Sequence, residues 1–293
     1  MIADLPQIIV TGLALGGLYA LMASGLTLIF GVMRIVNLAH PAFIFISAYI
    51  TWKLFTDLSI DPLVALAVTM PVMFVFGMIV YKLFFAREAD NPRYIEITVL
   101  TTFALALIIE GVLGFIFKGT VRSTNPPYSQ QAFFIGDIFL SRAQLYAGLI
   151  GIGLIAFLWV ILQYTRIGYA IRATTQNRSA AQVVGVNVER TSMIAFGLGV
   201  AMAGAAGSLF SFVFTFFPGG HWEWLAILLA LIVLGGMGSL PGAVIGAYLL
   251  TIASVFVNDQ IGFKWGPMTF FLALFIVLMV RPQGLFGSKI EAT

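Results

Sequence analysis

The sequence predicts an all-α, polytopic membrane protein with about eight or nine helical spans. Hydrophobic residues make up 60% of the chain, charged residues make up 9%, and the mean hydropathy is +1.03. Such a composition cannot cover a globular domain with polar surface. The charges also gather between apolar stretches of about 20 residues, the length that crosses a bilayer core. We therefore expect residues 1–293 to form a single transmembrane domain.

The individual spans follow from the stretches that lack charged residues. Most are as long as one membrane-spanning helix, but the stretch 224–258 is too long and is interrupted by Gly235-Gly-Met-Gly-Ser-Leu-Pro-Gly242. Glycine and proline break helices, so this stretch is either two short spans or one discontinuous element. The predicted spans are 5–33, 35–52, 62–81, 97–117, 143–165, 191–214, 224–258 and 265–280.

The loop 165–190 sets the expected orientation. It carries four arginines and one carboxylate, and positive loops stay in the cytoplasm. Alternation then places the N-terminus and the segment 118–142 outside. Arg281 and Lys289 favour a cytoplasmic C-terminus, which suits nine crossings. Three basic residues on the predicted external side depart from the rule: Lys118, Arg122 and Arg142.

The same loop has the composition of a docking element. Ala180, Val183 and Val184 form an apolar stripe at positions i, i+3 and i+4, as in a small amphipathic helix that is presented to a partner protein. The alternative is a loop that only holds the topology.

Candidate pathway residues lie inside or at the ends of spans. Glu110 is the one carboxylate well within an apolar span, and such a group is a functional candidate that lines a pore or carries a proton. Alternatively, it faces another helix as a hydrogen-bonded acid. The lone histidines His40 and His221 are more often structural than catalytic. The complete set of pathway candidates is Asn37, His40, Glu110, Gly236 and Gly238.

Small residues recur at every fourth position in three spans. These stripes allow helix backbones to approach closely inside one chain, or they mark a dimer seam or a movable contact. They are Gly12, Gly16, Ala20 and Ser24; Gly199, Ala203, Gly207 and Ser211; and Gly238, Gly242 and Gly246.

Enzyme chemistry finds no support in the sequence. His-Glu-x-x-His and Gly-x-Ser-x-Gly motifs are missing, and the glycine-rich segment 235–242 lacks the Gly-Lys-Ser/Thr ending of a P-loop. The chain contains no cysteine, which excludes disulfides and thiolate metal sites. The pI of 9.2 reflects loop topology and not nucleic-acid binding. We expect no catalytic residues, cofactor or metal.

Three segments resemble the branched-chain amino acid permeases of bacterial ABC importers, and the resemblance runs nearly end to end. They are Gly25-Leu-Thr-Leu-Ile-Phe-Gly-Val-Met-Arg-Ile-Val-Asn-Leu-Ala-His40, then Gly168-Tyr-Ala-Ile-Arg-Ala-Thr-Thr-Gln-Asn177 with Ala180-Ala181 and Gly185-Val-Asn187, and Arg281-Pro-Gln-Gly-Leu-Phe-Gly287. The chain is similar to the shorter of the two homologous permeases in those systems.

The resemblance implies a permease subunit in the bacterial inner membrane that imports leucine, isoleucine and valine. Its partners would be a homologous second permease, two cytoplasmic ABC ATPases and a periplasmic substrate-binding protein, within the lipid bilayer. Such permeases carry Glu-Ala-Ala-x-x-x-Gly in the coupling loop; here Ser179 replaces the Glu, and the usual downstream Leu-Pro is missing. The residues implied in ATPase coupling are Arg172, Asn177, Arg178, Ala180, Ala181 and Gly185.

Other functions stay open at this point. Related permeases carry urea, short amides, other amino acids or aromatic acids. A self-contained secondary transporter would need its own midplane site, with Glu110 coupling ions. The segment 118–142, with its prolines, is a candidate docking surface for the binding protein.

Overall fold

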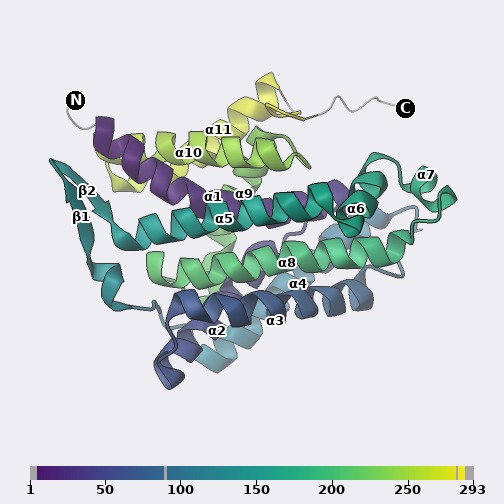
Figure 1. Ribbon diagram of the computed structural model, residues 1–293, viewed down its shortest axis with the longest axis horizontal. Helices are drawn as coiled ribbons and strands as arrows, with labels where there is room; N and C mark the ends of the chain where they lie inside the picture. Colours follow the sequence, from purple (N-terminus) through teal and green to yellow (C-terminus); the bar gives the residue numbers. More distant parts are fainter. Residues whose placement is uncertain (1–4, 89–90, 282, 288–293) are drawn as a thin grey trace.

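The computed structural model describes residues 5–88, 91–281 and 283–287, and long helices run along its long axis (Figure 1). Within these ranges, eight helical segments are long and apolar enough to cross a membrane, which confirms the predicted helical membrane fold. The elements are α1 Leu5–Met33, α2 His40–Leu58, α3 Pro62–Phe84, α4 Tyr94–Phe117, η1 Pro127–Gln130, β1 Ala132–Ile135, β2 Ile138–Ser141, α5 Arg142–Tyr164, α6 Arg166–Gln176, α7 Arg178–Val183, α8 Val188–Val213, η2 Pro218–Gly220, α9 His221–Gly235, α10 Leu240–Gln260, η3 Phe263–Trp265 and α11 Gly266–Val280.

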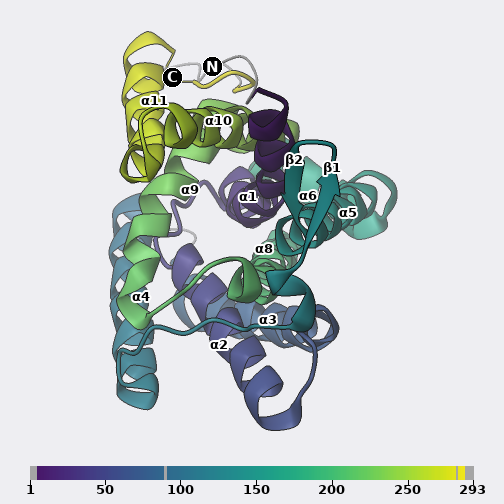
Figure 2. The same cartoon turned by 90° about the vertical axis from the view of Figure 1, so that its left-hand side faces the viewer.

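Helices α1 and α8 lie at the centre of the bundle, with the other helices around them (Figure 2). Small residues allow this position. A Cβ at Gly199 of α8 would lie 2.7 Å from the carbonyl oxygen of Gly25 in α1, and a Cβ at Gly207 would collide with the carbonyl oxygen of Ile44 in α2. Both glycines therefore allow α8 to contact the backbone of its neighbour.

The three small-residue stripes pack inside the chain. Gly12 and Gly16 of α1 face Ile252 and Tyr248 of α10, where an added Cβ would collide with the facing side chain. Gly242 and Gly246 of α10 face the last turns of α9 in the same way. Intrachain packing is therefore confirmed as a role of these stripes.

Helix α2 begins later than the sequence suggests. The predicted span 35–52 is wrong at its start, because residues 34–39 are not helical and α2 begins at His40. Arg34 adopts a left-handed conformation with φ of 54°, which ends α1. Pro41 has no backbone N–H and is tolerated only in the first turn of a helix, so it sets the new start.

The long apolar stretch 224–258 resolves into two helices, α9 and α10. Gly236 and Gly238 in the turn between them have φ values of 98° and 86°, which favour glycine. Residues 283–287 pack onto this turn: Leu285 N–H donates to the carbonyl of Leu234 at 2.8 Å, and Phe286 N–H donates to the carbonyl of Gly235 at 3.2 Å. A distant segment thus satisfies carbonyls that the helix end leaves open.

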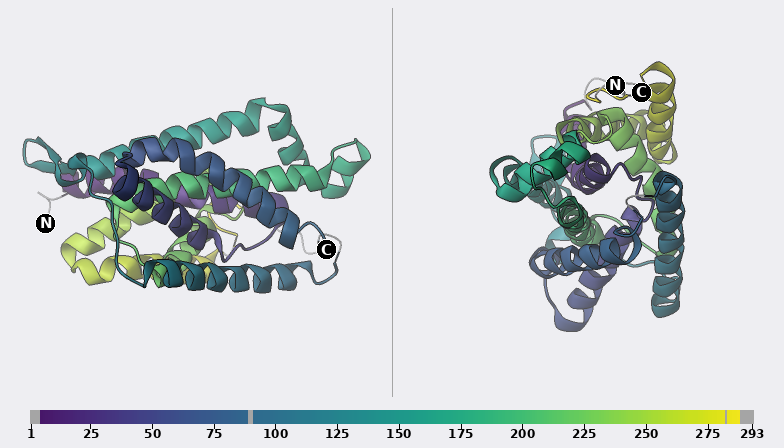
Figure 3. Two further views of the ribbon diagram at one scale, coloured as in Figure 1. Left: turned by 90° about the horizontal axis from the view of Figure 1, so that it is seen from below. Right: turned by 90° about the vertical axis from the view of Figure 1, so that its right-hand side faces the viewer.

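The segment 118–142 contains a two-stranded antiparallel hairpin, β1 and β2, which the all-α expectation did not include. The Gln7 side chain of α1 donates to the carbonyl of Phe139 at 2.7 Å and accepts from its N–H at 2.8 Å. The start of α1 and the hairpin therefore share one end of the molecule, whereas α6 and α7 lie at the other (Figures 1 and 3). This agrees with the expected opposite sidedness of 118–142 and 165–190.

A hydrogen bond anchors the same segment to the helices. The Tyr128 hydroxyl donates to Oδ1 of Asp61 at 3.1 Å, and the same oxygen accepts from the N–H of Leu63 at the start of α3. Burial, and then the nearby Asp61 carboxylate, raise the pKa of Tyr128. The phenol therefore stays protonated and keeps its role as donor.

The contact between α1 and α5 provides a test of backbone packing. A Cβ at Gly148 would collide with the carbonyl oxygen of Ala14, whereas Gly153 on the same helix has open space around it. We expect Gly148→Ala to lower the stability by about 1–3 kcal/mol through overpacking. Gly153→Ala should be neutral or stabilising by about 0.5–1 kcal/mol. Thermal unfolding of the purified variants in detergent measures both, and equal melting temperatures would contradict this account.

Candidate functional site: a coupling segment and an intramembrane carboxylate

The predicted coupling loop folds into two short helices, α6 and α7, at the end of the molecule opposite the hairpin (Figure 1). Side-chain caps divide the loop into these pieces. Oγ1 of Thr165 accepts from the N–H of Gly168 at 3.0 Å, Oδ1 of Asn177 accepts from Ala180 at 2.9 Å, and Oδ1 of Asn187 accepts from Arg190 at 2.9 Å. Each cap satisfies an amide at the start of α6, α7 or α8.

Helix α7 presents an apolar tip. Val183 is 87% exposed and Val184 is 77% exposed, while Ala181 on the other side of the helix is buried. Gly185 ends the helix with φ of 86°, and Val186 N–H donates to the carbonyl of Ala181 at 3.0 Å. The spacing of these two residues therefore has a structural reason: Ala181 lies on the buried side of α7, and Gly185 ends the helix.

Arg172 connects α6 to the end of α5. Its Nη1 donates to Oε1 of Gln163 at 2.6 Å, and its Nη2 donates to the Gln163 carbonyl at 3.2 Å. The guanidinium also lies 5.0 Å from the centre of the Tyr169 ring. Sequence reasoning selected Arg172 as a contact for the ATPase and missed Gln163, since a single glutamine at the end of an apolar span carries no recognisable signal.

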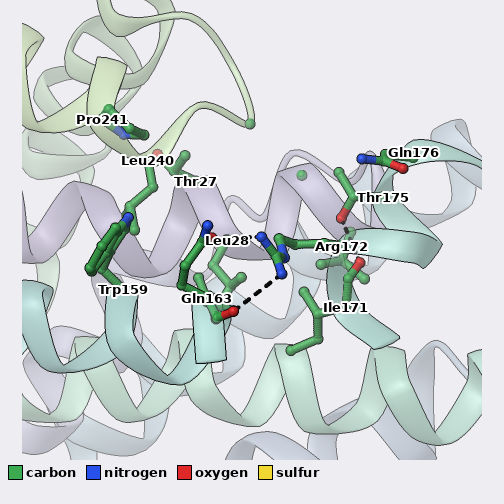
Figure 4. Close-up of a pocket in the computed structure, with 14 residues that line it drawn as sticks. Thr27, Leu28, Trp159, Gln163, Ile171, Arg172, Thr175, Gln176, Leu240 and Pro241 are labelled. Carbon is green, nitrogen blue, oxygen red and sulfur yellow. Dashed lines mark hydrogen bonds between the residues drawn. The ribbon is translucent and has the colours of Figure 1, made fainter. Parts of the chain in front are cut away.

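A pocket of about 340 Å³ lies between the ends of α1 and α5, helix α6 and the turn that joins α9 to α10 (Figure 4). Arg172, Gln163 and Trp159 line it from α5 and α6, and Thr27 lines it from α1 (Figure 4). Gly238 lines it from the α9–α10 turn. The structure thus brings together Arg172 and Gly238, which the sequence placed in the coupling and pathway sets respectively.

Glu110 of α4 lies against the start of α9. Its Oε2 accepts from the indole N–H of Trp222 at 2.8 Å and lies 3.5 Å from Nε2 of the fully buried His221. A Cβ at Gly219 would lie 3.1 Å from Oε1, so a larger residue there would press on the carboxylate. The sequence singled out Glu110 and His221 separately; it gave no sign that they meet or that Trp222 joins them.

The other pathway candidates lie apart from this cluster. Asn37 and His40 are fully buried, with His40 Nε2 lying 3.1 Å from the carbonyl of Met22 in α1 and Asn37 Oδ1 accepting from the N–H of Ala39. Gly236 packs against Gly287. In the described parts of the chain, no three histidine, aspartate or glutamate side chains gather as metal ligands.

Arg178 begins α7 and is half-buried, which makes it less available to a partner than the valine tip. Ala180, one residue before the buried Ala181, is exposed. The six predicted coupling residues therefore divide into those that build the segment and those that it presents.

Comparisons with known proteins agree with this architecture. Residues 8–280 match the family model described as "Branched-chain amino acid transport system / permease component". The chain is 29% identical to the "Probable branched-chain amino acid transport permease protein LivH" of Methanocaldococcus jannaschii, across 92% of this chain and 89% of that one. It is 26% identical to the "High-affinity branched-chain amino acid transport system permease protein LivH" of Escherichia coli (strain K12), across 94% and 93%.

A solved structure has a similar fold. The structure titled "PsaBC from Streptococcus pneumoniae in complex with Fab" superposes with a TM-score of 0.50 at 13% identity and covers 97% of each chain. This likeness concerns the fold alone.

The cap of α7 allows a direct test. Asn177→Ala removes the acceptor for the N–H of Ala180, and we expect α7 to lose about 1 kcal/mol of local stability. Hydrogen exchange of the α7 amides should accelerate accordingly. Asn177→Asp keeps an acceptor and should exchange like the unmodified chain; similar acceleration in both variants would show that capping does not hold α7.

Proposed function

The chain belongs to the branched-chain amino acid transport permease family, and from this premise we propose that it forms part of the import pathway for leucine, isoleucine and valine. It is a multi-pass membrane protein and a permease component of an ABC transporter family, which lacks an ATPase domain. The observation that carries the proposal is the family match over 8–280, together with a structured segment at one end of the helices.

The α6–α7 segment is the proposed docking site for the ATPase subunits. Two adjacent valines at the α7 tip are unusual on a polar loop unless a partner covers them. A short helix whose apolar side enters a groove is a common mode of recognition. Ala181 and Gly185 shape this helix, while Val183 and Val184 supply its contact surface.

Motion at α7 has a physical route into the bundle. Arg172 joins α6 to Gln163 at the end of α5, and the pocket beside this pair borders α1 and the α9–α10 turn. Gly238 of the turn lies against Gly31 of α1, where an added Cβ would be 3.3 Å from Cα of Gly31. A shift of α6 would therefore change the volume of this pocket. The contact of α1 with the α9–α10 turn at Gly31 and Gly238 would move with it, which supports switching between two packed arrangements.

The remaining partners follow from the family and from the exposed surfaces. Helices α4, α9 and α11 line one flank of the molecule (Figures 2 and 3), and α11 is largely exposed and apolar. We assign this flank to a second, homologous permease.

The substrate-binding protein is assigned to the end of the molecule opposite α7. There, Arg122 lies 4.2 Å from the ring centre of Trp52 and holds the segment before the hairpin against α2.

Transport by the assembled complex tests the substrate. We expect ATP-dependent uptake of radiolabelled leucine into proteoliposomes that contain this chain, its companion permease, the ATPases and the binding protein. Excess isoleucine or valine should compete, whereas urea and acetamide should not. Competition by urea or acetamide alone would indicate a permease for amides instead of amino acids. Uptake of leucine without ATP would contradict the proposed importer.

Docking is tested at the α7 tip. We expect Val183→Asp combined with Val184→Asp to reduce ATPase co-purification and leucine uptake by about tenfold or more, since two charges would be buried in an apolar groove. Val121→Asp is the matched control for ATPase co-purification, because Val121 is 64% exposed at the other end of the molecule. Equal co-purification of both variants would show that the ATPase binds elsewhere.

A further inference from the structure

Glu110 is unusual among the side chains on its flank. Its side chain is 33% exposed, about two turns before the end of α4, where the neighbouring outward residues Leu107, Ile108 and Val112 are apolar and about half exposed. A charged group that faces lipid is unfavourable, so intramembrane carboxylates generally face a bundle interior or a water-filled cavity. The face around Glu110 is therefore expected to meet water or a polar partner.

The Glu110 carboxylate is contacted from the start of α9. Trp222 donates its indole N–H to Oε2, so the carboxylate lies beside the first turn of α9, which also carries the exposed Glu223. His221 lies behind it, fully buried, and neither of its ring nitrogens has a hydrogen-bond partner in the described structure. Both side-chain contacts are made to Oε2, and Oε1 lies next to Gly219, where there is no side chain to cover it.

We propose that Glu110, held by Trp222 beside the buried His221, faces the aqueous translocation pathway and receives the ammonium group of the passing amino acid. This inference rests on the proposed function, because it takes an amino acid as the substrate. A zwitterion that crosses this largely apolar flank needs an acceptor for its ammonium group, and a carboxylate is the strongest acceptor available to a protein. The flank of α4, α9 and α11 would then line the route between the two permeases (Figure 2).

The chain contains no cysteine, so thiol labelling can test this proposal directly. Leu107 lies one turn from Glu110 on α4 and is 47% exposed. In the assembled complex in proteoliposomes, Leu107→Cys should react with membrane-impermeant thiosulfonates, and faster with a cationic than with an anionic reagent. The added change Glu110→Gln should reduce this preference by about tenfold, after correction for the intrinsic rates of the reagents.

The matched control is Val72→Cys on α3, which is 48% exposed and lies away from the α4 flank (Figure 2). We expect this side of α3 to face lipid, so the cysteine at position 72 should stay unreactive. An unreactive Leu107→Cys in every nucleotide state would overturn the proposal, as would a charge preference that does not depend on Glu110.

Leucine uptake supplies the second readout. Glu110→Gln should lower uptake about tenfold with ATPase co-purification unchanged, and Glu110→Asp should retain a larger share. Wild-type uptake in Glu110→Gln would overturn the role in ammonium binding. If the unmodified complex transports no leucine but Leu107→Cys still shows a charge preference that depends on Glu110, the cation site is supported and only the proposed substrate fails.

Discussion

Backbone contact between helices is the constraint on which the rest of this structure depends. Lipid offers no hydrophobic drive for helices to associate, so stability comes from close van der Waals packing. Gly25 of α1 meets Gly199 of α8, and Gly207 of α8 meets α2, so backbone atoms of the three helices come close together at these glycines. Close-packed contacts of this kind favour discrete arrangements over gradual deformation. The centre of the bundle is thus suited to switching.

The two ends of the molecule are built for different tasks. At one end, three caps and one left-handed glycine hold α6 and α7 in place, and the exposed valines of α7 face outward. At the other end, Asp61 and Tyr128 tie the hairpin segment to α3. The carboxylate of Glu110 lies between these ends, on the flank that also carries α11 (Figure 2).

Most of the helices were predictable because hydropathy and flanking charges mark them directly. The start of α2 was not, because the uncharged run begins at residue 35, whereas Arg34 ends one helix and Pro41 sets the start of the next. The hairpin was missed because its strands are four residues each and lie in a segment judged only by its prolines.

The sites divide in a similar way. The coupling loop was located from its arginines and its resemblance, but the bond between Arg172 and Gln163 and the meeting of Glu110 with Trp222 depend on tertiary packing. Glu110 and Trp222 are 112 residues apart in the chain, and nothing local in either segment indicates the other. Asn37 and His40 were selected at a span entrance; in the structure Asn37 accepts from the N–H of Ala39 just before α2, whereas the His40 ring lies against the carbonyl of Met22 in α1.

The pairing of residues 283–287 with the end of α9 has a consequence for synthesis. Leu234 and Gly235 leave the ribosome about 50 residues before Leu285 and Phe286, the residues whose amides satisfy their carbonyls. During insertion these carbonyls must bond to water or to the translocation machinery. The α9–α10 turn therefore reaches its final form only after residues 283–287 have been synthesised, and a nascent chain stalled after α11 would hold this turn in an incomplete form.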